Sequence, residues 1–140
     1  MALPAIVINI ATSLSQTGAS VLVIDADLRS PRLHKIFNLP NESGLNDYLT
    51  NNIELTKIDD SIVKRTDTLN FLTAGKLLSD CADCLSSKQM QKLLNILEKK
   101  FDFIVIDSPP VMTFADSAIL AAMTDGVLLV VQENRNSAES

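Results

Sequence analysis

Three aspartates in this sequence have the residue type and the spacing to bind a divalent cation. Asp25 ends the apolar run VLVID, Asp107 ends the apolar run FIVID, and Asp27 stands two residues after Asp25. In an extended chain, residues two apart project to the same side. Carboxylates that converge repel one another unless a cation or a proton lies between them. Mg²⁺ takes oxygen ligands and commonly binds through one or two carboxylates plus substrate phosphates, so these acids predict a magnesium site.

The same aspartates also admit a structural interpretation. An aspartate at the end of a strand often accepts hydrogen bonds from the turn or helix that follows it. Two apolar runs that both end in aspartate favour the cation site over simple capping. The capping alternative stays open at this point.

The elements that would position these acids alternate between strands and helices. Continuous apolar runs predict strands that are buried on both faces, at 21–25, 103–107 and 127–131. Apolar residues at helical spacing predict helices at 4–14 and 87–100. A polar, helix-prone segment lies near 44–50, and a shorter helix is predicted at 116–124. Two weaker strands are predicted at 62–63 and 69–72. Residues 6–8 are β-branched, so a strand is an alternative to a helix there.

Alternating strands and helices predict an α/β fold, with a doubly wound and mostly parallel sheet. In such sheets, ligands bind beyond the carboxyl ends of the strands, which is where Asp25, Asp27 and Asp107 are expected. A length of 140 residues with 46% hydrophobic residues predicts a single domain over 1–140.

Composition excludes several classes of function. A net charge of -5 without a run of Lys and Arg argues against a nucleic-acid-binding protein. The apolar runs have the length of strands, which predicts no membrane span. Two cysteines give no disulfide framework, so a cytoplasmic protein is expected. Small molecules and other proteins are the expected partners.

Two motifs resemble a known family. The run VLVIDADLRSPRLHKIF is similar to the second nucleotide-site motif, Walker A', of the bacterial tyrosine kinases that control capsule and exopolysaccharide production. The run FDFIVIDSPPV resembles their Walker B motif, and GLNDYL, LNFLTAG and DGVLLVV extend the likeness over most of the chain. These kinases belong to the deviant P-loop ATPases, which include the ParA and MinD partitioning proteins.

The resemblance implies a P-loop NTPase-like fold, Mg and ATP as cofactors, and phosphoryl transfer in the intact family. It implies that Asp25, Asp27 and Asp107 organise the metal and the attacking hydroxyl. It also implies that Arg29 meets phosphates or a neighbouring subunit. The turn that begins at Ser108 and Pro109 is expected to face the γ-phosphate. The family's partners are a second copy of the chain or a membrane-anchored polysaccharide co-polymerase that activates the kinase.

The sequence departs from the family at the phosphate loop. A loop of the form G-x-x-x-x-G-K-[ST] needs close backbone approach, a lysine and a hydroxyl. Counting back from Asn9 places Leu3 where the lysine belongs and Pro4 where the hydroxyl residue belongs. The domain is therefore expected to be truncated, without the first strand and the Walker A loop, and productive binding of ATP by this chain alone is not expected.

The missing strand predicts a second problem, because in the family it lies beside the Walker B strand. Residues 103–107 would then have unpaired backbone groups, each costing about 1 to 3 kcal/mol if buried and unsatisfied. A partner chain, a strand formed by residues 6–10, or closure of the sheet could fill the gap.

Weaker signals receive structural interpretations. Cys81 and Cys84 have the C-x-x-C spacing of metal and redox sites, but without a second pair they are expected to lie in a loop. Tyr48 is the only tyrosine and is expected to be a packing residue rather than a phosphate acceptor. His34 is expected to be structural, and Arg32 either binds phosphate or is solvated.

Three hypotheses for the function follow. The first is a portion of a tyrosine-kinase-type ATPase that is inactive by itself. The second is a non-catalytic protein-interaction module or remnant that keeps the family's sheet. The third is a partitioning ATPase similar to ParA and MinD.

Overall fold

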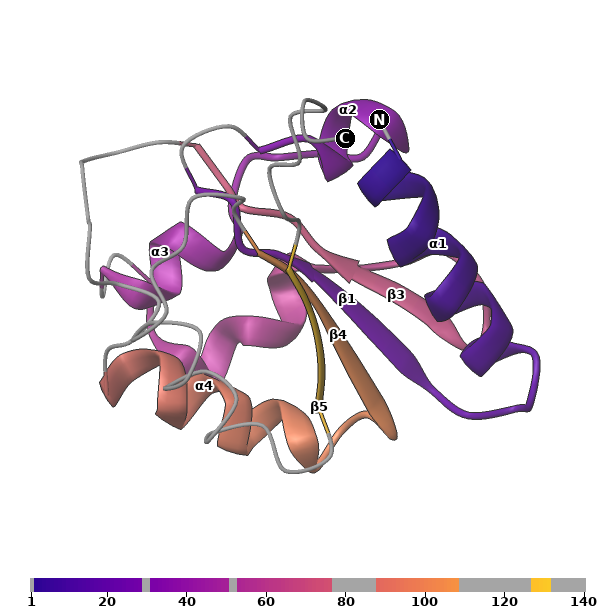
Figure 1. Ribbon diagram of the computed structural model, residues 1–140. Helices are drawn as coiled ribbons and strands as arrows, with labels where there is room; N and C mark the ends of the chain where they lie inside the picture. Colours follow the sequence, from indigo (N-terminus) through magenta and orange to yellow (C-terminus); the bar gives the residue numbers. More distant parts are fainter. Residues whose placement is uncertain (1, 29–30, 51–52, 77–87, 109–126, 132–140) are drawn as a thin grey trace.

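The computed structural model describes residues 2–28, 31–50, 53–76, 88–108 and 127–131. In this part of the chain, helices lie on both sides of a central sheet (Figure 1). The sheet has five strands in the order β2-β3-β1-β4-β5. They are β1 (Val21–Asp25), β2 (Ile62–Lys64), β3 (Leu69–Leu72), β4 (Phe103–Ser108) and β5 (Val127–Val131). The predicted α/β class with a mostly parallel sheet is confirmed, since only β2 is antiparallel to its neighbour.

The helices divide between the two faces of this sheet. On one face lie α1 (Ala2–Ser15) and the short α2 (Leu33–Ile36). On the other lie α3 (Leu45–Leu49) and α4 (Lys88–Glu98), with the 3-10 helix η1 (Leu55–Ser61) leading into β2. Residues 6–10 are helical, so the alternative of an N-terminal strand is wrong. The predicted helix at 116–124 lies outside the described residues.

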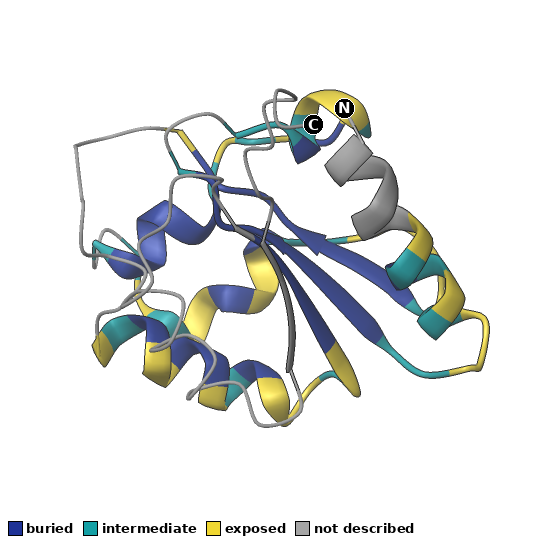
Figure 2. Ribbon diagram, in the orientation of Figure 1, coloured by how far each residue is buried: buried dark blue, intermediate teal, exposed yellow. Residues whose placement is uncertain are grey.

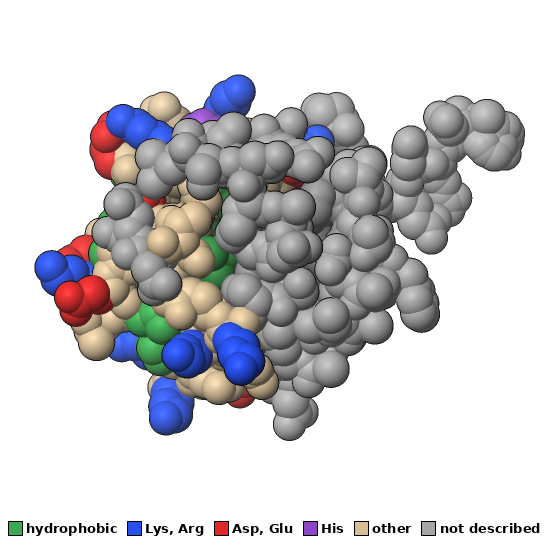
Figure 3. All heavy atoms as spheres, turned by 90° about the vertical axis from the view of Figure 1, so that its left-hand side faces the viewer, with side chains coloured by type: hydrophobic (Ala, Val, Ile, Leu, Met, Phe, Trp, Pro, Cys, Tyr) green, Lys and Arg blue, Asp and Glu red, His purple; other side chains and the backbone are tan. Residues whose placement is uncertain are grey.

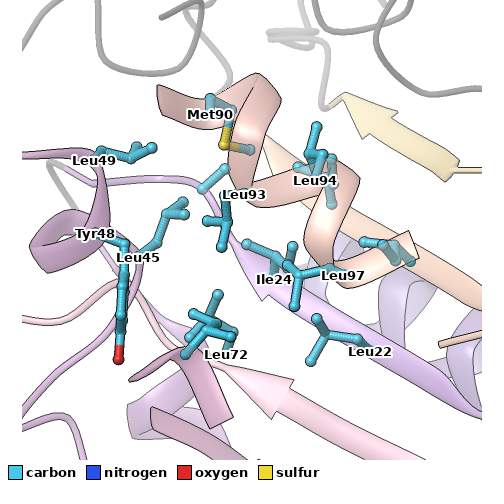
Figure 4. Packing of buried hydrophobic residues seen from close by; sticks show 14 residues of the cluster. Leu22, Ile24, Leu45, Tyr48, Leu49, Leu72, Met90, Leu93, Leu94 and Leu97 are labelled. Carbon is cyan, nitrogen blue, oxygen red and sulfur yellow. The ribbon is translucent and has the colours of Figure 1, made fainter. Parts of the chain in front are cut away.

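Two apolar clusters fill the space between the sheet and its helices. Alternation of side chains along β1 sends Leu22 and Ile24 toward α3 and α4, and Val21 and Val23 toward α1. Figure 4 shows Leu93, Leu94 and Leu97 of α4 packed over this strand and β3. Figure 2 shows that the described residues of the central strands are mostly buried, while the outer side of α4 is exposed. This double cover explains why β1 reads as an uninterrupted apolar run.

The expected gap beside β4 is not present. β4 pairs with β1 on one side and with β5 on the other, in a parallel register that joins Ile104 to Val127. Of the three predicted ways of filling the gap, closure of the sheet is the one observed, because β4 pairs directly with β5. β5 thus supplies the backbone donors and acceptors that the missing strand would have supplied.

Helix α3 is joined to the end of β3 by close backbone contact. The N–H groups of Leu45 and Asn46 donate to the carbonyls of Thr73 (2.8 Å) and Ala74 (2.9 Å). A Cβ on Gly44 would lie 2.2 Å from the Thr73 carbonyl oxygen, so only glycine fits there. Gly75 has a φ of 84°, a value that favours glycine. The motifs GLNDYL and LNFLTAG thus form one structural unit.

Candidate active site at the carboxyl ends of β1 and β4

Asp25 and Asp107 stand directly opposite each other at the carboxyl ends of neighbouring parallel strands. The register of β1 and β4 pairs these two residues. Each aspartate lies two residues after a valine that faces α1, namely Val23 and Val105. Because side chains alternate along a strand, both carboxylates project to that same face of the sheet. Asp25 is completely buried and Asp107 is 2% exposed. The structure therefore brings together two acids that are 82 residues apart in the sequence.

Asp25 is held by the chain that follows it. Its Oδ1 accepts a hydrogen bond from the backbone N–H of Asp27 (3.1 Å). Its Oδ2 accepts from the N–H groups of Arg32 (3.0 Å) and Leu33 (3.1 Å), where α2 begins. The capping interpretation thus describes Asp25 well, because the carboxylate satisfies donors that the start of a helix leaves unpaired.

Asp107 has a different environment. Its Oδ1 is buried and accepts no hydrogen bond within the described structure. Burial, followed by the negative charge of Asp25, raises the pKa of Asp107 from 3.8 to about 6, while the charge of Arg32 opposes this rise. A buried carboxylate oxygen without a donor is uncommon, and it is the feature that makes Asp107 a candidate ligand.

Burial also dominates the electrostatics of Asp25. It raises the pKa of the carboxyl group above 3.8, and the three backbone hydrogen bonds act against this rise. The nearby charge of Asp27 adds to it. Two acids with raised pKa values at one end of a sheet are typical of a functional site, although structural networks produce the same effect.

The other predicted site residues are placed only in part. Asp27 is 7% exposed and lies just beyond the end of β1. Ser108 is the last residue of β4 and pairs with Val131, while Arg29 and Pro109 lie outside the described residues, as do Cys81 and Cys84. The described residues hold no group of three His, Cys, Asp or Glu side chains arranged for a metal ion. The metal roles of the three aspartates therefore stay predictions.

Sequence reasoning missed one feature of this site and left another undecided. The missed feature is α2, a helix of four residues that no apolar periodicity marks and whose start contacts Asp25. The undecided feature is Arg32, which was expected either to bind phosphate or to be solvated, and whose charge acts to lower the pKa of Asp107. The spacing D-A-D-L-R-S-P-R was visible, but which of its side chains faces β4 depends on how the loop folds.

Tyr48 lies in the core, as expected for a packing residue. It is completely buried, and its hydroxyl donates to the Lys57 carbonyl (3.0 Å) and contacts Ser61 Oγ (2.5 Å). Burial raises its pKa above 10.0. A phosphate could not reach this hydroxyl without opening the cluster around it.

The AAA domain family matches residues 4–140 of this sequence. The chain belongs to the AAA-domain family. Within this family its relatives include the putative tyrosine-protein kinase CapB of Staphylococcus aureus, 38% identical over 130 residues, and the tyrosine-protein kinase YwqD of Bacillus subtilis, 33% identical over 132 residues. These alignments cover 92% and 94% of this chain but 56% and 54% of the relatives, so the chain spans about half of their length.

Solved structures with a similar fold include two that are at least 30% identical to this chain. The chimerical protein CapA2B2 has a TM-score of 0.76 and 33% identity, over 96% of this chain and 58% of that one. The kinase domain of Escherichia coli ETK has a TM-score of 0.71 and 30% identity, over 86% of this chain and 47% of that one. The resemblance to the bacterial tyrosine kinases is therefore confirmed.

A more distant likeness concerns the fold alone. Cobyrinic acid a,c-diamide synthase from Mycobacterium smegmatis, solved with an ATP analog and magnesium, has a TM-score of 0.56 and 11% identity over 91% of this chain and 67% of that one. It supports the P-loop-like architecture.

No helix in the described part of the chain has the length and hydropathy needed to cross a bilayer.

Proposed function

We propose that this chain is the aspartate-bearing part of a tyrosine-kinase-type ATPase of capsule or exopolysaccharide biosynthesis, which transfers a phosphoryl group from Mg-ATP to a tyrosine hydroxyl. The observation that carries the proposal is the buried pair of Asp25 and Asp107 at the carboxyl ends of adjacent parallel strands. Ligands of open α/β sheets bind at this edge. The relatives named as tyrosine kinases support the reaction class.

The donor set at this edge fits magnesium. Oxygen ligands from one or two carboxylates, completed by phosphates and water, are what Mg²⁺ usually takes. Asp107 is the first candidate ligand, since its buried Oδ1 has no donor among the described residues. Asp27 is the second, because it lies next to Asp25 at the end of β1. Bound Mg²⁺ would neutralise charge that develops on the transferred phosphoryl group.

Asp25 has a different part in this proposal. Three of its lone pairs already accept backbone N–H groups, so it positions the loop that carries Asp27 and Arg32. One remaining lone pair on Oδ1 could still orient the attacking hydroxyl. Arg29, Ser108 and Pro109 are proposed to meet the nucleotide, as the family resemblance implies.

The phosphate-binding loop has to come from outside these 140 residues. Helix α1 packs on the face of the sheet that carries the acid pair, and its first turn lies at the carboxyl end of the strands (Figure 1). A glycine-rich loop leading into this helix would place its backbone N–H groups beside Asp25 and Asp107. Without that loop, the acids face a triphosphate with no compensating donors, so we propose that the chain alone is inactive.

The non-catalytic interaction module is the second candidate, and the capping role of Asp25 favours it. A carboxylate that satisfies three backbone donors would be retained for stability even if no nucleotide bound. In either case we propose a cytoplasmic protein whose partner is a second copy or a membrane-anchored activator. The mass of the chain in solution, alone and mixed with the activator's cytoplasmic segment, tests the partner.

Calorimetric titration with Mg-ATP tests the catalytic proposal. The 140-residue chain should give no binding heat. A chain extended by an upstream strand and a GEGKST-type loop, whose lysine and serine replace Leu3 and Pro4, should bind in the micromolar range. Asp107→Asn in the extended chain should weaken binding by about ten-fold or more, and Asp67→Asn, an exposed acid in a turn, should not. Micromolar binding by the 140-residue chain, abolished by Asp27→Asn, would contradict the proposal that it is inactive.

A further inference from the structure

Helix α4 and the turn that follows it carry three exposed lysines along one side. Lys88, Lys92 and Lys99, here called the lysine stripe, are separated by four and seven residues. At 3.6 residues per turn this spacing confines them to about 40° of the helix circumference and about 16 Å of its length. Lys99 follows the last residue of α4, and its N–H donates to the Ile96 carbonyl (3.3 Å), which continues the turn. Figure 3 shows basic side chains gathered along the lower edge of this face of the molecule.

In the described part of the chain, the lysine stripe has no carboxylate partner within 4.0 Å. Three other lysines each lie within 4.0 Å of a carboxylate, in the pairs Lys64–Asp67, Lys76–Glu42 and Lys100–Asp59. Within the described residues, no such pair involves a member of the lysine stripe. Lys35 and Lys57 are exposed without such a pair as well, so alignment along one side of α4 is what sets the lysine stripe apart from the other described lysines.

The arrangement is also unfavourable for the helix itself. Lys88 is the first residue of α4, where the positive end of the helix dipole disfavours a cation. Lys88 and Lys92 are four residues apart, so their like charges repel. Because the whole chain has a net charge of -5, the lysine stripe is no consequence of a basic composition. A solvated surface is the simplest explanation of exposed lysines, but it does not account for this alignment.

We propose that the lysine stripe binds an acidic segment of a partner protein that presents about three carboxylates over about 16 Å. Charge complementarity fixes the chemistry of the partner, and the straight, narrow line of charges fits a single helix or strand. Screening limits each charge to a range of about 8 Å at physiological salt, so a narrow segment on the lysine stripe is largely shielded from the acidic remainder of the molecule.

A membrane or a nucleic acid fits less well. Recognition of anionic lipid usually takes roughly four to eight basic residues or an apolar side chain that inserts. Large exposed hydrophobic residues of the described chain are Ile36 and Phe103, and neither lies on α4. A broad anionic surface would also meet the negative charge of the rest of the protein.

The lysine stripe lies far from the acid pair in the architecture. Helix α4 covers the face of the sheet opposite to α1, whereas Asp25 and Asp107 project toward α1. A segment bound on α4 would leave the nucleotide edge open. The inference therefore stands independently of the proposed phosphoryl transfer.

Fluorescence anisotropy with a designed peptide tests the proposal. The probe is a labelled alanine-rich helix with glutamates at the spacing of the lysine stripe, and its control has glutamine at those positions. The full chain should bind the glutamate peptide at low ionic strength and release it in high salt, and should not bind the glutamine peptide. The triple variant Lys88→Gln, Lys92→Gln, Lys99→Gln should weaken binding by about ten-fold or more.

A matched variant removes the same charge elsewhere. Lys35→Gln, Lys57→Gln, Lys64→Gln also loses three exposed lysines and should change affinity by less than about two-fold. Equal weakening by both variants, or no binding by the unmodified chain, would overturn the proposal. So would binding of phosphatidylserine vesicles in place of the peptide, since that result would assign the lysine stripe to a membrane.

Discussion

The carboxyl end of β3 and the carboxyl ends of β1 and β4 differ in how their polar groups are paired. At the end of β3, backbone meets backbone, with Gly44 against Thr73 and Gly75 and no space for a side chain. At the ends of β1 and β4, buried carboxylates face each other, and one oxygen of Asp107 lacks a donor. At the end of β3 the backbone groups of Thr73 and Ala74 have hydrogen-bond partners, whereas at the ends of β1 and β4 a buried carboxylate oxygen has none among the described residues. Because all three carboxyl ends lie at the same edge of the sheet, this difference singles out the β1–β4 part of that edge as the candidate ligand site.

Gly44→Ala should have the largest effect. Gly44 has an extended backbone with a φ of -168°, so the penalty is steric and not conformational. A Cβ 2.2 Å from the Thr73 oxygen and 2.3 Å from the Gly75 nitrogen must push α3 away from β3. We expect the free energy of unfolding to fall by about 4 kcal/mol or more, measured by urea denaturation. Gly18→Ala is the matched control for steric crowding, since nothing lies within 4 Å of its Cβ position, although its φ of 92° adds some strain.

Asp25→Ala should come next, because it leaves three backbone N–H groups without an acceptor. We expect a loss of about 2 to 4 kcal/mol in unfolding free energy at neutral pH, reduced by the relief of burying a charge. Asp25→Asn keeps one carbonyl oxygen and should lose less. Hydrogen exchange of the Leu33 amide would report the loss locally, and unchanged protection there would contradict the capping role.

Asp107→Asn should act in the opposite direction. A pKa raised from 3.8 to about 6 means that the folded state holds its proton more tightly than the unfolded state. This contribution to stability is complete below about pH 4 and is lost as the pH rises through about 6. In metal-free buffer at pH 7.5, the variant should therefore be more stable than the original chain by about 1 to 2 kcal/mol.

The pH profile distinguishes this explanation from a general effect of the amide. The stabilisation by Asp107→Asn should disappear near pH 4, where both chains carry a neutral group at this position. Asp102→Asn, at the opposite end of β4, offers a comparison with an exposed acid. A stabilisation that stays constant from pH 4 to pH 8 would show that the charge of Asp107 is not the cause.

Tyr48→Phe should have the smallest effect of the four. The variant keeps the ring in the apolar cluster and removes hydrogen bonds to Lys57 and Ser61. Ser61 Oγ keeps its contact with Ser43 Oγ (2.6 Å), so little is left unsatisfied. We expect a loss of about 1 kcal/mol, measured by thermal or urea unfolding. A loss above about 3 kcal/mol would mean that the hydroxyl organises the region around α3.

The sequence by itself determined most of the elements and the edge of the sheet where the acids lie. The runs VLVID and FIVID predicted strands that are buried on both faces, because continuous apolar residues suit a covered parallel sheet, and both are strands in the structure. Helix α4 followed from the spacing of Met90, Leu93, Leu94 and Leu97. These are local patterns, and local patterns are what a sequence displays.

Tertiary structure decided which residues meet across the fold. Three features join residues that are distant in the chain. They are the pairing of β4 with β5, the contact of Gly44 with Thr73, and the different environments of the neighbouring Asp25 and Asp107. Each depends on which distant segment lies beside which, and the periodicity within one segment does not specify its neighbour. The aspartates were identical in the sequence, and only their neighbours in space made one a cap and left the other with an unsatisfied oxygen.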